Sequence, residues 1–158
     1  EKPAAIVMTE VLPDRGRIAQ NAGADHVCNP NHEDVVAAIR KLHPEGLDVV
    51  FECAGQQETL DQGTELLKPG GRLMVIGIPR EPRVSFCPDI LRRNEITIIN
   101  VRRQNHCTQK AIDLIASGQV DLNFMVTHRF EFEQAPAAFD LVAGYRDGVV
   151  KALVRGAV

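Results

Sequence analysis

The chain has 158 residues, of which 44% are hydrophobic and 25% are charged, and its formal net charge is −3. This length can bury one substantial core, and the composition is ordinary for a globular protein. The Lys and Arg residues form no basic stripe with interleaved aromatic residues, so we expect no nucleic-acid partner. The apolar runs have strand length, short of the roughly 20 residues that a membrane-spanning helix needs, so we expect no membrane association.

Cysteine usage predicts a reducing compartment. The four cysteines, at positions 28, 53, 87 and 107, are far apart and form no CxxC pair and no Cys/His pair at zinc-ligand spacing. The opening residues do not have the pattern of a secretory signal peptide. We therefore expect free thiols in a cytoplasmic protein, and we assign no metal ligand in this chain.

Hydrophobic periodicity predicts strands that alternate with helices. Apolar runs indicate strands at 4–9, 24–28, 47–52, 72–76, 96–101, 126–132 and 149–154. Helical spacing indicates helices at 15–22, 33–42, 108–117 and 135–142, one that carries Leu60, Leu66 and Leu67, and a short one around Ile90. Such alternation is typical of an α/β fold with a doubly wound parallel sheet.

Capping residues mark several helix boundaries. Pro13 lies near the first turn of the first helix, and Gly23 lies just past its end. Asn31 or His32 is the expected cap of the second helix. Pro69-Gly70-Gly71 is the expected stop between the third helix and the next strand.

The stretch from Leu47 to Pro79 has the pattern of two buried strands joined by a helix. Parallel sheets bind ligands outside the carboxyl ends of their strands. Here those ends carry Cys53-Ala54-Gly55 and Gly77-Ile78-Pro79, whose small or constrained residues would let a flat ligand approach the backbone. Ordinary turn chemistry, with no ligand, explains the same glycines equally simply.

Glu10 follows the first predicted strand. A carboxylate at that position can accept hydrogen bonds from both ribose hydroxyls of an adenine nucleotide and repels a 2′-phosphate. The alternative is a solvated acid at a strand end. Arg15, five residues further on, would lie beside the adenine, pair with Glu10, or neutralise a 2′-phosphate and so permit NADP. No G-x-G-x-x-G or G-x-x-x-x-G-K-[ST] motif is present to hold the phosphates.

The motifs at 6–10, 15, 22–25, 47–55, 67–72, 76–79, 100–105 and 126–130 occur in a familiar order. Together they resemble the coenzyme domain of the medium-chain, zinc-dependent alcohol dehydrogenases, and within that family the polyol (sorbitol-like) branch. The resemblance covers essentially the whole chain. It implies a Rossmann-like doubly wound parallel sheet, and NAD-dependent oxidation of a secondary alcohol or polyol whose oxygen lies on a catalytic zinc.

The resemblance also implies roles for individual residues. Glu10 would bind the adenosine ribose, and Arg15 would lie near the adenine. Cys53, Ala54 and Gly55 would line the nicotinamide ribose, and Ile76, Gly77 and Ile78 would face the nicotinamide carboxamide. Arg103 matches an arginine that reaches the substrate in the polyol branch, although a surface cation beside Arg102 is the alternative.

The family's remaining parts are expected outside this chain. The zinc-bearing catalytic domain, the first strand and the glycine-rich turn are missing, so residues 1–158 would form a partial dinucleotide-binding domain that is inactive alone. In the family's strand order, 3-2-1-4-5-6, the missing strand belongs between 4–9 and 47–52, where its absence leaves backbone groups without partners. We also expect a homo-oligomer that pairs edge to edge through the strand at 96–101 or its neighbour.

Two other functional classes stay open at this point. S-adenosylmethionine-dependent methyltransferases also place an acid after their second strand and often carry a Lys-Pro-Gly-Gly turn like that at 68–71. The motifs at 52–55 and 77–79 are more like those of the dehydrogenases. A non-catalytic nucleotide-binding or self-association module is the third possibility.

Overall fold

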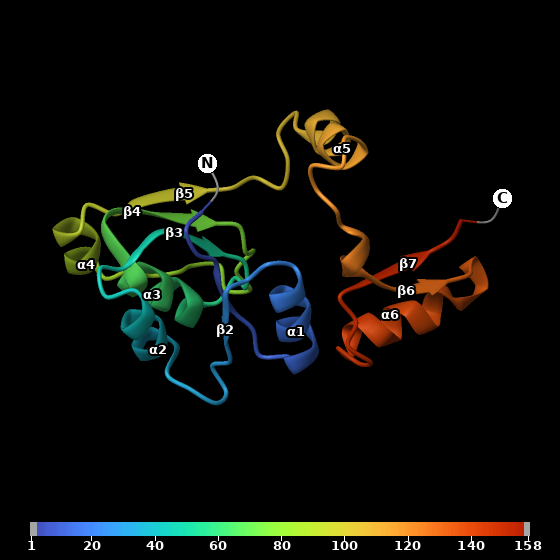
Figure 1. The fold of residues 1–158 in the computed structure, drawn as a ribbon, viewed down its shortest axis with the longest axis horizontal. Coiled ribbons are helices and arrows are strands. Elements are labelled where there is room, and N and C mark those ends of the chain that lie inside the picture. The colour runs from blue at the N-terminus through green and yellow to red at the C-terminus, as the bar shows by residue number, and fades with distance from the viewer. Residues whose placement is uncertain (1–2, 157–158) are drawn as a thin grey trace. The chain divides into compact units, whose positions relative to one another are not determined.

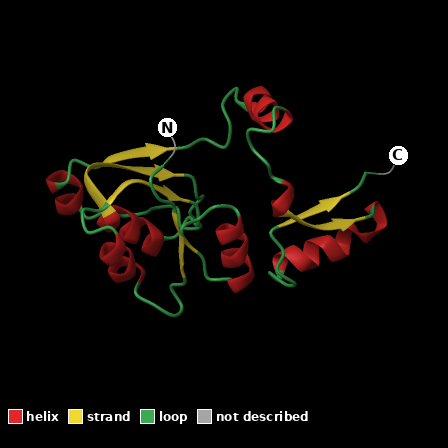
Figure 2. Cartoon of the chain, in the orientation of Figure 1, coloured by secondary structure: helices red, strands yellow, loops and turns green. Residues whose placement is uncertain are grey.

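The computed structural model describes residues 3–156 (Figure 1). The chain forms two compact units, one built from the chain up to Glu33 and from Gln109 onward, the other from Asp34 to Thr108. Strands alternate with helices in both units (Figure 2). All the strand pairs among the described residues are parallel, so the predicted α/β class with parallel strands is confirmed.

The unit from Asp34 to Thr108 contains a three-stranded sheet in the order β3-β4-β5. Its elements are α2 (Val35–Leu42), β3 (Leu47–Glu52), α3 (Gln57–Leu66), β4 (Leu67–Val75), α4 (Pro88–Arg93) and β5 (Thr97–Asn100). Helix α3 packs on β3 and β4, and α2 packs on α3 (Figure 1). Leu60, Leu67 and Leu73 are buried at the centre of this packing and form the core of the unit.

The unit built from the two ends of the chain contains two separate two-stranded sheets. The first part comprises β1 (Val7–Thr9), α1 (Pro13–Asn21) and β2 (His26–Cys28). The second part comprises α5 (Thr108–Ala116), β6 (Val126–Phe130), α6 (Ala135–Ala143) and β7 (Lys151–Val154), with 3-10 turns at Asn123–Met125 and Phe132–Gln134. As predicted, Pro13 opens α1, and Gly23 follows its end with a φ of +106°.

The predicted helix stop at Pro69-Gly70-Gly71 is wrong. Helix α3 passes directly into β4 at Leu67, and the Pro-Gly-Gly sequence lies inside the strand. The β3–β4 ladder shifts its register at this point, and Gly70 has a φ of +75°. Pro69-Gly70-Gly71 therefore forms an irregularity within β4. The glycines allow the backbone to interrupt its regular pairing with β3 and to resume it at Arg72.

The predicted cap of α2 is also wrong. Asp34 is the capping residue, and its Oδ1 accepts a hydrogen bond from the Ala37 N–H at 3.0 Å. Asn31 belongs to the preceding turn instead, where its N–H donates to the Asn29 side chain. Both Asn and Asp can cap helices, so composition alone did not decide between neighbouring candidates.

The predicted sheet is divided into three. Among the described residues, β1 pairs only with β2, and β3 pairs with β4 on one side only. The pairs β1–β2, β3–β4 and β4–β5 agree with the predicted order. Among the described residues β1 and β3 are not paired, and the strand expected between them stays a prediction.

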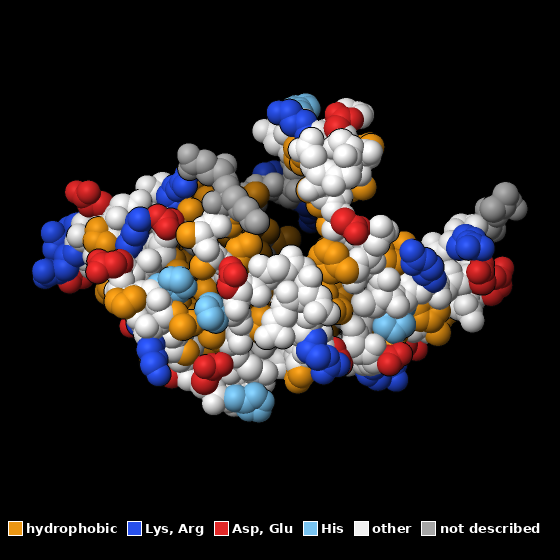
Figure 3. Space-filling view, viewed as in Figure 1, with side chains coloured by type: hydrophobic (Ala, Val, Ile, Leu, Met, Phe, Trp, Pro, Cys, Tyr) orange, Lys and Arg blue, Asp and Glu red, His pale blue; other side chains and the backbone are white. Residues whose placement is uncertain are grey.

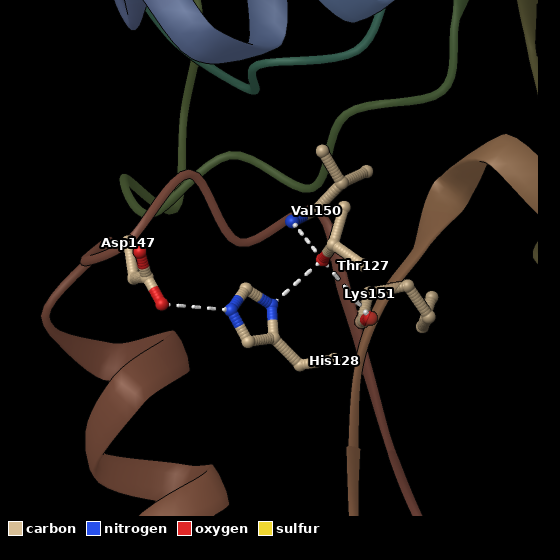
Figure 4. A network of polar contacts seen from close by, with 5 residues as sticks. All are labelled: Thr127, His128, Asp147, Val150 and Lys151. Atoms are coloured by element: carbon tan, nitrogen blue, oxygen red, sulfur yellow. Dashed lines mark hydrogen bonds and ion pairs between the residues drawn. The ribbon is translucent and has the colours of Figure 1, made fainter.

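A β-bulge at Thr127 shapes the sheet formed by β6 and β7. Val126 pairs with Lys151 and His128 with Ala152, so Thr127 has no partner of its own. Its hydroxyl takes the place of a backbone group: it accepts from the Val150 N–H at 3.1 Å and donates to the Lys151 carbonyl at 3.3 Å (Figure 4). His128 lies beside this hydroxyl, with Nδ1 at 2.9 Å from Oγ1, and its Nε2 lies 3.2 Å from Oδ2 of Asp147.

Candidate nucleotide-binding site

The turns that follow β3 and β4 lie against each other. A Cβ at Gly77 would lie 2.3 Å from the backbone nitrogen of Gly55, and a Cβ at Gly55 would lie 2.5 Å from the carbonyl oxygen of Ile78. Both distances are far shorter than any real contact, so only glycine fits at either position. The sequence placed both turns at the carboxyl ends of strands, and these strands are neighbours in one sheet. The contact between the two backbones, which requires glycine at both positions, was not predicted.

Around this contact the turns present small and apolar side chains to solvent. Cys53 and Ala54 are exposed, and Ile76 and Ile78 have exposed fractions of 41% and 74%. Isoleucine side chains left this exposed at a strand end provide an apolar surface for a flat ligand.

Glu52, the last residue of β3, holds both turns in place. Its side chain is buried, with an exposed fraction of 3%. Its Oε1 accepts hydrogen bonds from the Ala54 N–H at 2.8 Å, the Gly55 N–H at 2.7 Å and the Thr59 hydroxyl at 2.7 Å. The sequence reasoning did not identify this residue. An acid directly after the apolar run Val49-Val50-Phe51 was the available signal, because a carboxylate is buried there only if donors surround it.

The thiol of Cys53 lies next to this carboxylate. Although the residue as a whole is exposed, partial desolvation of its sulfur and, to a smaller extent, the negative charge of Glu52 raise the pKa of the Cys53 thiol above its ordinary value. Both causes favour the neutral thiol, so Cys53 is not an activated nucleophile.

Glu10 directly follows β1, as predicted. Its N–H donates to the Cys28 carbonyl at 3.0 Å and so extends the β1–β2 ladder. Its Oε1 accepts a hydrogen bond from the Leu12 N–H at 2.9 Å, immediately before α1. The carboxylate is therefore oriented by the turn that connects the strand to the helix.

Arg15 is held by residues far along the chain. Its Nε and Nη2 donate to the carbonyl oxygen of Val149 at 3.1 and 3.0 Å, and its guanidinium lies 5.1 Å from the centre of the Tyr145 ring. None of the ion pairs among the described residues joins Arg15 to Glu10, which was one of its predicted partners. Sequence reasoning missed Tyr145 and Val149, because nothing local indicates a contact over this separation.

The predicted site residues belong to different units. Glu10 and Arg15 lie in the unit built from the chain ends, whereas Cys53–Gly55, Ile76–Ile78 and Arg103 lie in the unit from Asp34 to Thr108. Arg103 is exposed in the loop after β5. On the face drawn in Figure 3, Lys and Arg side chains are interspersed with Asp and Glu.

The pattern of the zinc-binding dehydrogenase family matches residues 3–117, which include β1 to β5 and both glycine turns. The chain belongs to this family. The sorbitol dehydrogenase of Bacillus subtilis is 28% identical over 150 residues, which cover 94% of this chain and 42% of that protein. An alcohol dehydrogenase of Cupriavidus necator is 35% identical over 146 residues, which cover 89% of this chain and 40% of that protein.

A solved structure shares the fold over almost the whole chain. A protein from Sinorhizobium meliloti, described as a zinc-binding dehydrogenase bound to NADP, is 30% identical and superimposes with a TM-score of 0.87, over 97% of this chain and 45% of that one. The chain thus spans less than half the length of these relatives. Within a zinc-binding dehydrogenase, it corresponds to the nucleotide-binding domain with its Rossmann-like fold.

Across residues 3–156, no three His, Cys, Asp or Glu side chains come close enough together to hold a metal ion. No helix in the same range is long and apolar enough to cross a membrane.

Proposed function

We propose that this chain is the coenzyme-binding part of an oxidoreductase that transfers a hydride from a secondary alcohol or polyol to NAD. The observation that carries the proposal is the pair of glycine turns, packed against each other at the carboxyl ends of β3 and β4. Parallel sheets bind ligands at the carboxyl ends of neighbouring strands, where backbone groups are accessible. Membership in a dehydrogenase family favours a nucleotide coenzyme as that ligand. When bound, a zinc ion held by residues outside this chain would supply Lewis-acid chemistry at the substrate oxygen.

The two turns would bind the nicotinamide end of the coenzyme. Cys53, Ala54 and Gly55 would line the nicotinamide ribose, because they are small and their backbone is fixed by Glu52. Ile76, Gly77 and Ile78 would face the carboxamide. The exposed isoleucines would cover the nicotinamide ring and exclude water from the site of hydride transfer.

Glu10 and Arg15 would bind the adenosine end and favour NAD over NADP. Glu10 presents a carboxylate after β1, which accepts ribose hydroxyls and repels a 2′-phosphate. The Arg15 guanidinium is engaged by the Val149 carbonyl through Nε and Nη2, which leaves it less able to neutralise a 2′-phosphate. The S. meliloti relative was solved with NADP, and titration with both coenzymes tests the preference proposed for this chain.

We also propose that a further strand pairs with the free edge of β3. The Glu52 carbonyl accepts hydrogen bonds from the N–H groups of Ile76 and Gly77, which directly follow β4. Successive residues of a strand direct their N–H and C=O groups to opposite edges, so those of Phe51 point to the edge away from β4. The Phe51 side chain is 64% exposed. A partner strand would satisfy these backbone groups and complete a dinucleotide-binding domain, next to a separate zinc-bearing domain.

Three smaller assignments rest on the same family membership. Arg103 would reach the alcohol or polyol substrate from the loop after β5. The exposed edge of the three-stranded sheet at β5 would pair with a second copy of the protein to form a homo-oligomer. The proposed compartment is the cytoplasm, in agreement with cysteines that form no disulfide among the described residues.

The first experiment is to determine the full reading frame that contains this chain and to express its product. We expect an upstream strand with a glycine-rich turn, and further upstream the Cys, His and Glu ligands of zinc. NADH and NADPH are then titrated by fluorescence into the wild type, the Glu10→Ala variant and a Glu133→Ala control, which removes an exposed acid elsewhere in the same unit.

Glu10→Ala should weaken NADH binding about tenfold or more, the effect of losing hydrogen bonds to a charged group, while NADPH binding is unchanged or tighter. Glu133→Ala should change neither. Equal loss of both coenzymes in Glu10→Ala would overturn the ribose assignment. A wild type that binds neither coenzyme would overturn the proposed function itself.

A further inference from the structure

One buried carboxylate connects three segments of the candidate site. The side chain of Glu52 accepts hydrogen bonds from the turn after β3, at Ala54 and Gly55, and from the first turns of α3, at Thr59. Its backbone carbonyl accepts from the Ile76 N–H at 2.8 Å and the Gly77 N–H at 2.9 Å, at the end of β4. A single residue therefore fixes both glycine turns and the helix that follows the first of them.

The two oxygens of this carboxylate have very different surroundings. Oε1 has three donors, whereas Oε2 is buried and has no hydrogen-bond partner among residues 3–156. Oε2 lies on the Gly77 side, where a Cβ on Gly77 would be only 2.5 Å away. Burying a carboxylate oxygen without a donor is unfavourable, and a neutral side chain would avoid that cost. Stability alone therefore does not explain an acid at this position.

We propose that Glu52 is the positioning residue that sets the geometry of the two nicotinamide-side turns, with Thr59 as its support from α3. The inference rests on the proposed function, because it concerns how that same site binds its coenzyme. Charged hydrogen bonds are shorter and stronger than neutral ones, so a carboxylate holds the Ala54 and Gly55 N–H groups more rigidly than an amide or hydroxyl would. A rigid turn loses less conformational freedom when the coenzyme binds.

Thr59 provides a way to weaken the carboxylate without removing it. Its hydroxyl donates to Oε1 at 2.7 Å and lies 2.9 Å from the Gln56 carbonyl, so Thr59→Val takes away one of the three donors to Glu52. Thr64 is the matched control on the same helix. It is buried, and its hydroxyl donates to the Asp61 carbonyl at 2.9 Å and not to Glu52.

The test compares two ligands in the full reading-frame product. NADH contacts both ends of the proposed site, whereas ADP lacks both the nicotinamide ring and the ribose that residues 53–55 would line. Dissociation constants for both are measured by calorimetry in the wild type and in the Glu52→Gln, Thr59→Val and Thr64→Val variants. Thermal unfolding in the same buffer identifies any variant that fails to fold.

A positioning role predicts a selective loss. Glu52→Gln should weaken NADH binding about tenfold and Thr59→Val about threefold, while ADP binding stays within about twofold in both. Thr64→Val should leave both ligands within about twofold of the wild type.

A purely structural role would lower the unfolding temperature and weaken both ligands together, or neither, and either pattern would overturn the proposal. If Glu52→Gln does not fold, the ratio of the NADH and ADP dissociation constants of Thr59→Val decides alone. A wild type that binds ADP as tightly as NADH would overturn the positioning role while leaving nucleotide binding intact. A wild type that binds neither ligand would overturn the proposed function instead.

Discussion

Arg15 and Val149 are joined by two hydrogen bonds across 134 positions of the sequence, from Nε at 3.1 Å and Nη2 at 3.0 Å to one carbonyl oxygen. The Tyr145 ring lies beside the same guanidinium, at 5.1 Å. The contact ties α1 to the segment that leads into β7. Arg15 thus has a structural role within its unit in addition to any role beside a nucleotide.

Replacing Arg15 should therefore reduce stability. We expect Arg15→Lys to lower the free energy of unfolding by about 1–3 kcal/mol, because lysine can replace neither the forked pair of donors nor the flat guanidinium over Tyr145. Urea unfolding measures the loss. The control is Arg17→Ala, which removes an exposed ion pair with Asp14 on the same helix and should cost less than about 0.5 kcal/mol. Equal losses in the two variants would show that the Val149 contact contributes nothing.

Thr127 should be sensitive to loss of its hydroxyl and tolerant of loss of its methyl group. In Thr127→Val the Val150 N–H and the Lys151 carbonyl lose their partner at the bulge (Figure 4), which should lower the free energy of unfolding by about 1–3 kcal/mol. Thr127→Ser keeps the hydroxyl and should recover most of that loss. Thermal or urea unfolding of the two variants gives the comparison, and a serine variant as unstable as the valine variant would contradict this account.

The sequence predicted most of this fold because the strong signals are local. Apolar runs of strand length and helical spacing located all seven strands and six α-helices of the described residues, although several strands are shorter than predicted. The errors occurred where two local signals compete. Pro69-Gly70-Gly71 is as compatible with an irregular strand as with a helix stop, and Asn31, His32 and Asp34 are adjacent candidates for one cap.

The site was predictable only in part, for a related reason. The glycine turns are visible in the sequence, and their place at one edge of the sheet follows from strand order. Glu52 and Arg15 obtain their partners through tertiary contacts, from Thr59 on a packed helix and from Val149 near the far end of the chain. Periodicity and spacing carry no information about such pairs.

Gly77 should tolerate no side chain. In Gly77→Ala the new Cβ would meet the Gly55 backbone and the Glu52 carboxylate, neither of which can move without disrupting the turn. We expect a loss of at least about 2 kcal/mol in the free energy of unfolding. Gly70→Ala is the control, because its Cβ would meet nothing within 4 Å and only its φ of +75° is strained, which costs about 1–2 kcal/mol. A Gly77→Ala variant more stable than Gly70→Ala would show that the two turns are not packed as described.

The Cys53 thiol should report on the charge of Glu52. Burial and the Glu52 carboxylate raise the pKa of this thiol, so its thiolate fraction is small at neutral pH. The rate of its alkylation by iodoacetamide should therefore rise with pH, and the midpoint of that rise should lie above the ordinary pKa of a cysteine. Mass spectrometry of the Cys53 peptide follows this reaction separately from the other three cysteines. Glu52→Gln removes the negative charge but not the burial, so the profile should move to lower pH without reaching that of a free thiol. Thr59→Val keeps the charge and should leave the profile nearly in place. If the Glu52→Gln profile matches that of the wild type, the carboxylate does not affect the thiol, and desolvation alone raises the pKa of Cys53.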